Sequence, residues 1–285
     1  MGGVREPTPR TLTHSQEQPI MKPALTELVL PKLPVPEFIA TAKEAGFESV
    51  ELAVRNSSEF PFSYSTTDEQ LKTFSQASRE LGLPIDSITI SNASGHLLLP
   101  PDQARDAIAE TIWALECGAR LGATAALHTL GRCTPDLFYE DAYQNAIANL
   151  KTLAPVCERL HIALAVEFIW SGFLFSPLEM RRLLETVGSP DVGFYFDSGN
   201  MAIFQYPQHW VRALGPHIKR VHLKDFAGGP GKNSWPGLLK GSVDFHAVMA
   251  ELRRAGYDGP LVSEVSISDQ PLAETAAAIR EIMTY

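Results

Sequence analysis

Cysteine is scarce in this chain, and its few copies stand far apart. Cys117, Cys133 and Cys157 are the three cysteines among 285 residues, and no Cys-x-x-Cys motif occurs. Folds that depend on disulfides need many paired cysteines, and thiolate zinc sites need closely spaced ones. The sequence therefore predicts neither a disulfide framework nor a cysteine zinc site, and it fits a reducing compartment.

Long apolar segments are also missing. No run approaches the roughly 20 apolar residues that cross a bilayer. Residues 1–20 are polar, carry prolines at positions 7 and 9, and lack the apolar centre of a secretory signal. We interpret residues 1–21 as a disordered tail or leader, with Met21 as a candidate natural start. We expect a soluble, cytoplasmic protein.

Positive charge is not in excess. The chain has 24 Lys and Arg against 33 Asp and Glu, a net charge of −9. Broad binding of nucleic acids or of anionic membranes requires a basic face, so the charge weighs against both partners while leaving room for a local basic pocket. Hydrophobic residues make up 45% of the chain, enough for a large core in one barrel-sized domain or two smaller domains.

Short apolar runs alternate along the chain with segments whose apolar residues recur every three or four positions. This alternation is typical of βαβ units and a parallel sheet. The predicted strands are 25–30, 49–54, 85–90, 123–128, 162–168, 192–197, 218–223 and 260–265. The predicted helices are 36–45, 67–81, 102–121, 139–160, 177–187, 206–214, 243–255 and 270–283.

Eight strand–helix units in about 260 residues match the size of a (β/α)8 TIM barrel. We therefore predict an α/β fold with a single TIM-barrel domain over residues 22–285. A doubly wound open sheet is the second choice. That fold usually places a Gly-x-Gly-x-x-Gly motif after its first strand, whereas the segment here reads PKLPVPEF.

Titratable residues interrupt or end four successive predicted strands. They are Glu167, Asp197, His222 and Glu264, in the segments AVEF, YFDSGN, HLKD and VSEV. In a TIM barrel such residues meet at the carboxyl ends of the strands. Three buried carboxylates would repel one another and cost several kcal/mol unless a cation compensated them. We predict one divalent metal ion, with Mn²⁺ as the first choice and Co²⁺, Mg²⁺ or Zn²⁺ as alternatives. Three oxygen donors and one nitrogen favour Mn²⁺, Co²⁺ or Mg²⁺ over a thiolate-type zinc site.

The segment from about 162 to 266 resembles the xylose-isomerase-like TIM-barrel superfamily of sugar and sugar-phosphate isomerases and epimerases. AVEF, YFDSGN, HLKD and GYDGPLVSEV carry the resemblance, with GSVDF before the seventh helix. Weaker likeness extends through GFESVELAV and ECGARLGA. The resemblance implies that the four residues above bind the metal. It also implies that Glu167 and Glu264 move a proton to and from opposite faces of a metal-bound enediolate.

The expected activity is thus a metal-dependent isomerase or epimerase of a sugar or sugar phosphate in carbohydrate metabolism, similar to ketose 3-epimerases. Two positions depart from the free-ketose enzymes. Asn200 stands where many relatives have histidine, and Gly228 stands where they have arginine. We expect Asn200 to hydrogen-bond a substrate hydroxyl. Both differences weigh against a simple free-ketose 3-epimerase.

Two other activities use the same scaffold. One is a metal-dependent lyase or dehydratase acting on a keto-sugar, a keto-inositol or an oxidised C-glycoside, and no residue separates it from an epimerase. A more distant alternative is an apurinic-site endonuclease, which needs about three zinc ions and extra histidines. Asn200 and the net charge of −9 oppose that activity. The expected partner is a small sugar, and a homo-oligomer is left open.

Other residues near the predicted strand ends are candidates for substrate contact. They are Glu51, His128, Trp170 and Lys224, in addition to Asn200. Each has a structural alternative. Glu51 could balance a cation, His128 could cap a strand, Trp170 could pack in the core, and Lys224 could pair with Asp225.

The segment 228–241 is long and glycine-rich, and it contains Lys232 and Lys240. Loops after the last strands of this fold often bind phosphate, because glycine lets backbone N–H groups approach an anion. A mobile lid and a plain flexible loop are the alternatives. His96, in the segment SNASGH, is expected near the rim as a loop residue.

Overall fold

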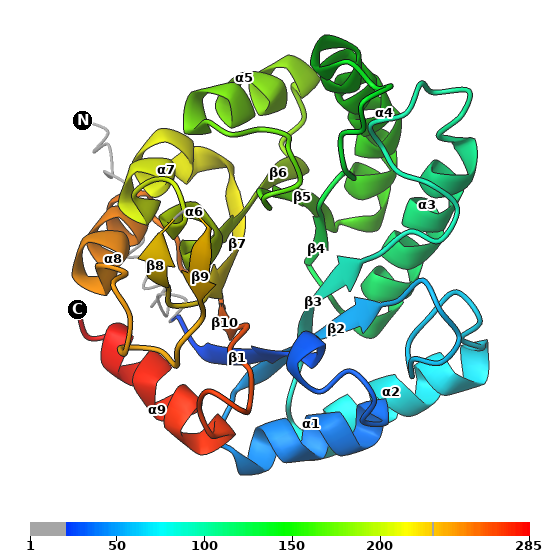
Figure 1. Cartoon of the computed structure of the whole chain (residues 1–285). Helices are drawn as coiled ribbons and strands as arrows, with labels where there is room; N and C mark the ends of the chain where they lie inside the picture. Colours follow the sequence, from blue (N-terminus) through cyan, green and yellow to red (C-terminus); the bar gives the residue numbers. More distant parts are fainter. Residues whose placement is uncertain (1–20, 230) are drawn as a thin grey trace, which may run out of the picture.

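The structure is a computed structural model that describes residues 21–229 and 231–285. Within these ranges, eight parallel strands close into a barrel in the order β1-β10-β7-β6-β5-β4-β3-β2 (Figure 1). The strands are β1 (Pro23–Thr26), β2 (Ser49–Val54), β3 (Ile85–Ile90), β4 (Ala125–His128), β5 (Ala163–Glu167), β6 (Val192–Asp197), β7 (Ile218–Leu223) and β10 (Leu261–Ser263). The predicted (β/α)8 fold is confirmed. Because all neighbouring strands are parallel, their carboxyl ends open on one mouth.

Helices connect the strands and surround the barrel (Figure 1). They are α1 (Val35–Glu44), α2 (Asp68–Leu81), α3 (Arg105–Leu121), α4 (Tyr139–Leu160), α5 (Pro177–Val187), α6 (Ser198–Ala202), α7 (Pro207–Leu214), α8 (Phe245–Arg254) and α9 (Leu272–Ile282). Local sequence fixes several ends. Thr67 and Gln70 form a capping box at the start of α2, and Gly82 ends that helix with a positive φ of 58°.

The first predicted strand, 25–30, is wrong in its position. Strand β1 ends at Thr26, and Glu27–Val29 form a 3-10 helix that begins when Thr26 accepts a hydrogen bond from the Leu28 N–H. The Ala53 N–H of β2 donates to the Glu27 carboxylate at 3.1 Å, instead of to a backbone carbonyl of a longer β1. A side chain thus replaces one rung of the ladder, and the chain can turn toward α1.

One helix and one two-stranded hairpin at the mouth were not predicted. Helix α6 begins directly after β6, because Asp197 accepts hydrogen bonds from the N–H groups of Gly199 and Asn200. Strands β8 (Ala227–Gly229) and β9 (Lys232–Ser234) form a hairpin inside the predicted loop. Gly228 has a φ of 121°, and a Cβ there would lie 1.8 Å from the Lys232 carbonyl oxygen. Only glycine fits this close approach.

The core has two parts of different chemistry. A large apolar cluster fills the layer between the strands and the surrounding helices, with Phe38, Leu52, Ile88 and Trp210 among its fully buried side chains. Inside the barrel, the apolar cluster is small, and polar side chains continue the filling toward the mouth. This division places titratable groups in a solvent-poor position on a rigid frame.

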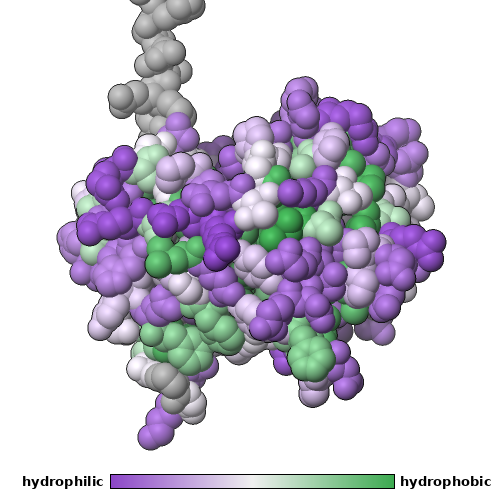
Figure 2. Space-filling model, turned by 90° about the horizontal axis from the view of Figure 1, so that it is seen from above, coloured by the Kyte–Doolittle hydropathy of each residue, from purple (hydrophilic) through white to green (hydrophobic). Residues whose placement is uncertain are grey.

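Figure 2, turned by 90° from Figure 1, shows a hydrophilic surface that is interrupted by green hydrophobic areas in its centre and along its lower edge. No helix in the described ranges has the length and apolar character that crossing a membrane demands. Apart from Met21, the predicted tail over residues 1–21 lies outside the described residues.

Candidate metal centre

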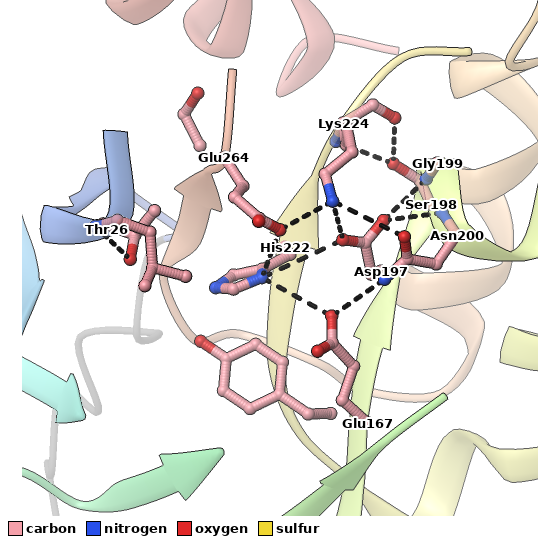
Figure 3. A network of polar contacts seen from close by, with 12 residues as sticks. Thr26, Glu167, Asp197, Ser198, Gly199, Asn200, His222, Lys224 and Glu264 are labelled. Carbon is pink, nitrogen blue, oxygen red and sulfur yellow. Dashed lines mark hydrogen bonds and ion pairs between the residues drawn. The ribbon is translucent and has the colours of Figure 1, made fainter. Parts of the chain in front are cut away.

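The four predicted metal ligands converge at the mouth. Glu167 and Asp197 are the last residues of β5 and β6, His222 lies in β7, and Glu264 follows β10 directly. These strands are consecutive neighbours in the barrel, in the order β10-β7-β6-β5. One ligand atom from each residue lies within 4.8 Å of the others (Figure 3). Among the described residues, this is the one group of that kind.

Two atoms of this cluster have unused bonding capacity. Across the described part of the chain, His222 Nδ1 and Asp197 Oδ2 are buried without a hydrogen-bond partner, although Asp197 Oδ2 forms an ion pair with Lys224 Nζ at 3.1 Å. His222 Nδ1 lies 3.3 Å from Glu264 Oε2, 3.8 Å from Glu167 Oε1 and 3.9 Å from Asp197 Oδ2. Buried polar groups are rarely left unpaired, because each loses its bonds to water. A divalent ion among these atoms would satisfy both, so the donor set fits such an ion.

The cluster is an unfavourable environment for the negative charges of Glu167 and Asp197. Burial raises the pKa of Glu167, and the charges of Asp197 and Glu264 add to the rise. Burial likewise raises the pKa of Asp197, although Lys224 opposes the shift. Burial also works against the charge of Glu264, but Lys224 and His222 outweigh it and lower the pKa of that carboxyl. The carboxylates therefore depend on nearby positive charge, which a bound cation would supply.

Lys224 supplies part of that positive charge. Its Nζ lies 2.7 Å from Glu264 Oε2 and 3.1 Å from Asp197 Oδ2, and it also lies over the ring of Trp235 at 5.2 Å. Burial works against its charge, but Asp197 and Glu264 raise the pKa of Lys224. Lys224 therefore pairs with two metal-ligand candidates and not with Asp225, the alternative partner that the sequence offered.

Asp225 instead ties together the two ends of the long loop. Its Oδ1 accepts hydrogen bonds from the N–H groups of Phe226 and Val243 at 2.8 and 3.1 Å, and its Oδ2 accepts from Gly241 at 2.8 Å. A Cβ at Gly241 would lie 2.2 Å from Asp225 Oδ1. The glycine of the GSVDF motif is thus required for the close contact that closes this loop.

Asn200 and two tryptophans form one side of the cluster. The Nδ2 of Asn200 donates to Glu167 Oε1 at 3.1 Å, and its Oδ1 accepts from Trp170 Nε1 at 3.2 Å and from Lys224 Nζ at 3.5 Å. The Trp170 ring stacks on Trp235 with centroids 5.8 Å apart, and Trp170 stays 50% exposed. Asn200 therefore holds Glu167 in place, while Trp170 keeps a surface open at the mouth.

His128 holds a loop. Its Nδ1 accepts from the Leu130 N–H at 2.8 Å, so its Nε2–H donates to Asn92 Oδ1 at 2.6 Å. Leu130 has a left-handed φ of 63°, which this bond helps to stabilise. Burial, with a smaller effect of His96, lowers the pKa of His128 to about 4. Both ring nitrogens are engaged, as in the strand-cap alternative, and substrate contact by His128 stays a prediction.

Glu51 lies behind His222, inside the barrel. Its Oε1 accepts from His222 Nε2 at 2.8 Å, and its Oε2 accepts from Ser87 Oγ at 2.7 Å and from the Tyr195 hydroxyl. Glu51 is 0% exposed. Burial opposes its charge, but His222 and these hydrogen bonds lower its pKa. Its place next to His222 fits the cation-balancing alternative, and substrate contact by Glu51 stays a prediction.

Three residues around the site were not singled out in the sequence. Tyr195 stands two residues before Asp197 on β6, so both point to the same side of the strand, and this period-2 spacing could have revealed it. Ser87 has no such signal, because serine occurs anywhere in a strand. Trp235 lay in a segment that offered no periodicity, so its stacking could not be predicted.

The remaining candidates lie at the rim. Lys232 is exposed, and Lys240 pairs with Glu274 at 3.9 Å. His96 is half-buried, and its Nδ1 accepts from the Leu98 N–H at 3.3 Å. Phosphate binding by segment 228–241 stays a prediction.

The chain belongs to the xylose isomerase-like TIM barrel family, whose model matches residues 39–283. The resemblance inferred from the sequence motifs is therefore confirmed. Among curated proteins, the chain is 26% identical over 250 residues to the L-ribulose-5-phosphate 3-epimerase UlaE of Escherichia coli O157:H7 (strain EC4115 / EHEC), covering 85% of this chain and 86% of that protein. It is 25% identical over 248 residues to the enzyme of the same name from Salmonella heidelberg (strain SL476), covering 84% and 86%.

Solved structures share the fold. D-psicose 3-epimerase with D-tagatose from Clostridium cellulolyticum H10 matches with a TM-score of 0.78 and 16% identity, over 93% of this chain and 99% of that chain. The 3-keto-D-glucoside 4-epimerase YcjR from E. coli matches with a TM-score of 0.75 and 17% identity, over 93% and 100%. The sequence relatives of the present chain are sugar epimerases, which supports an enzyme of the isomerase and epimerase kind.

Proposed function

We propose that this protein is a divalent-metal-dependent 3-epimerase of a ketose or ketose phosphate. The observation that carries the proposal is the convergence of Glu167, Asp197, His222 and Glu264, in which His222 Nδ1 and Asp197 Oδ2 are buried without a hydrogen-bond partner among the described residues. Sequence relatives named L-ribulose-5-phosphate 3-epimerase support the reaction class.

The two glutamates are the proposed proton carriers. They stand at the two ends of the four-strand arc, Glu264 after β10 and Glu167 on β5, with His222 and Asp197 between them. A substrate held over the arc would thus have one carboxylate on each side. One carboxylate takes the proton from carbon 3, which carries a hydroxyl group and adjoins the carbonyl carbon. The electron pair of the broken C–H bond stays in the enediolate. The other returns a proton to the opposite face.

Each glutamate has its own positioning partner. Asn200 Nδ2 donates to Glu167 at 3.1 Å, and Lys224 Nζ donates to Glu264 at 2.7 Å. When bound, a divalent ion would polarise the carbonyl and stabilise the negative charge that develops as the proton leaves. Mn²⁺ is the proposed ion, because carboxylate oxygens dominate the donor set.

The stacked indoles are the proposed wall for the part of the sugar that does not react. Trp170 keeps half of its surface exposed. Trp170 contacts Asn200 and Trp235 contacts Lys224, and these two residues in turn contact the metal-ligand candidates. Aromatic faces suit the C–H face of a sugar. Lys224 would donate to a hydroxyl or phosphate by exchanging one of its contacts with Glu264, Asp197 or Asn200. A cytoplasmic location and a homo-oligomer remain predictions.

The decisive experiment combines metal content with isotope exchange. The protein, loaded with Mn²⁺ and with occupancy measured, is incubated in D₂O with L-ribulose 5-phosphate, L-ribulose and D-psicose in parallel. We expect deuterium at carbon 3 of one of them, together with its 3-epimer. At equal occupancy, Glu167→Gln and Glu264→Gln should each lower kcat by about 10²–10⁴, since glutamine keeps the size but accepts no proton.

Glu274→Gln is the matched control, because Glu274 is an exposed residue of α9 and its change should leave kcat unaltered. An elimination product without return of the proton would identify a lyase instead. Wild-type rates in both fully loaded glutamine variants would refute the two-carboxylate mechanism. A wild-type protein that binds no divalent ion would refute the metal dependence.

A further inference from the structure

A carboxylate is enclosed inside the barrel below the metal centre. Glu51, Tyr195, Ser87 and His222 are all 0% exposed, and they form one connected polar group. Burying a charge costs several kcal/mol unless donors surround it. Three hydrogen bonds, from Ser87, Tyr195 and His222, converge on Glu51 and offset the cost of burying its charge. The apolar filling that is usual for a barrel interior would avoid it altogether.

The hydrogen bonds define which nitrogen of His222 is free. A carboxylate only accepts, so the Nε2 atom 2.8 Å from Glu51 Oε1 must carry a proton. The other nitrogen, Nδ1, then faces Glu264, Glu167 and Asp197. It is the buried ring atom without a hydrogen-bond partner in the described ranges. Glu51 therefore selects the ring orientation that presents Nδ1 to the cluster.

Tyr195 stabilises the same arrangement from the side. Its hydroxyl donates to Glu51 Oε2, and its ring meets the His222 ring edge-on with centroids 4.6 Å apart. Ser87 donates to the same Oε2 atom at 2.7 Å, and it pairs with Glu51 in the β2–β3 register. Both oxygens of Glu51 accept hydrogen bonds. If the carboxylate turned away from His222, it would also lose the bonds from Ser87 and Tyr195.

The contact crosses the barrel interior. Strands β2 and β7 are not neighbours, because β1 and β10 stand between them in the closed order. Glu51 reaches His222 through the space inside the ring of strands, over 171 positions of sequence. A backbone ladder cannot produce this pairing, so it depends on these two side chains.

We propose that Glu51 is a positioning residue for metal binding, which fixes His222 with its Nδ1 directed into the cluster. The proposal rests on the metal site of the proposed function and deepens it. Histidines that bind metals commonly donate their second N–H to a carboxylate, and loss of that partner typically costs about 10–100-fold in metal affinity.

The test measures affinity for Mn²⁺ and Co²⁺ by competition with a chelator, without substrate. Glu51→Gln keeps the size and one acceptor but removes the charge, and we expect metal affinity about 10–100-fold below that of the wild type. The visible spectrum of bound Co²⁺ should change, because the ring is held less firmly. Tyr195→Phe is the matched control. It leaves the Glu51–His222 bond in place, so it should weaken affinity by less than Glu51→Gln.

A double variant separates positioning from a general charge effect. In a His222→Ala background, Glu51→Gln should lower affinity by no more than about twofold, because the residue through which Glu51 acts is gone. A full additional loss would overturn the proposal, and so would wild-type affinity in Glu51→Gln itself. If circular dichroism shows that Glu51→Gln does not fold, Glu51→Asp replaces it, and unchanged affinity in that variant would overturn the proposal. Failure of the wild type to bind metal would instead overturn the proposed function.

Discussion

The two halves of the barrel mouth use polar side chains in opposite ways. In the half made by β10, β7, β6 and β5, four titratable residues point at one another (Figure 3). Two of their buried atoms, His222 Nδ1 and Asp197 Oδ2, have no hydrogen-bond partner among the described residues. In the half made by β1 to β4, polar side chains at or just after the strand ends bind backbone N–H groups. His128 has both ring nitrogens engaged, and Glu27 accepts the Ala53 N–H.

The difference shows that a polar residue at a strand end is not by itself a functional group. Unused bonding capacity alone does not separate the halves, because Glu27 Oε1 is also buried without a hydrogen-bond partner among the described residues. What separates them is the convergence of four titratable side chains on a common point. Burial raises the pKa of Glu27 to about 8, although Arg55 opposes the shift, and this carboxyl still serves backbone structure. Glu51 connects the halves, because it belongs to β2 and acts on His222 of β7.

The largest expected effect is on metal affinity, which should fall for variants in the β10-β7-β6-β5 half of the mouth and not for variants in the other half. His222→Ala removes a nitrogen donor from the arc, so we expect metal affinity to fall by more than about 100-fold, beyond the usual cost of losing an outer partner. Asp197→Asn should act in the same direction and keep the cap of α6, since its Oδ1 can still accept from Gly199 and Asn200. Isothermal titration with Mn²⁺ measures both.

The control for this prediction comes from the other half. His128→Gln changes a buried histidine of β4 that lies outside the cluster, so its metal affinity should stay within about twofold of the wild type. If His128→Gln loses affinity as strongly as His222→Ala, the distinction between the two halves is wrong.

The next effect is on the contribution that His128 makes to the pH dependence of stability. Burial, with His96 adding to it, lowers the pKa of His128 to about 4 in the folded chain. In the unfolded chain, the histidine takes up a proton as the pH falls below about 6.5. The unfolded state then binds more protons, so the contribution of His128 to stability is complete above pH 6.5 and is lost between pH 6.5 and pH 4, by roughly 3 kcal/mol. The raised pKa values of Glu27 and Glu167 act in the opposite direction over this interval, so the contribution of His128 is read from the difference between the wild type and a His128 variant.

Urea unfolding at several pH values would measure this slope. His128→Gln removes the titrating group, so its free energy of unfolding should fall less steeply over the same interval, even if its value at pH 7 is lower. Parallel curves for the variant and the wild type would show that His128 does not cause the pH dependence.

The smallest expected effect concerns the loop beside the cluster. In Gly241→Ala, the new Cβ would lie 2.2 Å from Asp225 Oδ1, so the loop must shift and stability should fall by about 1–3 kcal/mol. Gly229→Ala is the matched control, because Gly229 has nothing within 4 Å of a Cβ. Thermal unfolding compares the two. Equal midpoints would mean that Asp225 does not restrain the loop at Gly241.

Much of the fold follows from local patterns in the sequence. The predicted strands 49–54, 85–90, 192–197 and 218–223 have the observed bounds, as do the helices 139–160 and 177–187. Apolar runs and helical spacing are sufficient there, because each element buries a continuous surface. The first strand failed because the Glu27 side chain ends it, and that depends on an N–H of another strand.

The sequence by itself determined the order of the elements, the barrel and the four residues that could meet at its mouth, since parallel strands bring their carboxyl ends together. Only the tertiary structure decided the roles of the others. Glu51, His128 and Lys224 look alike in sequence, as polar residues in or beside strands. Which partner each one reaches depends on contacts between distant segments, such as Glu51 with His222 across the barrel. Those contacts arise from the closure of the sheet, which no local pattern encodes.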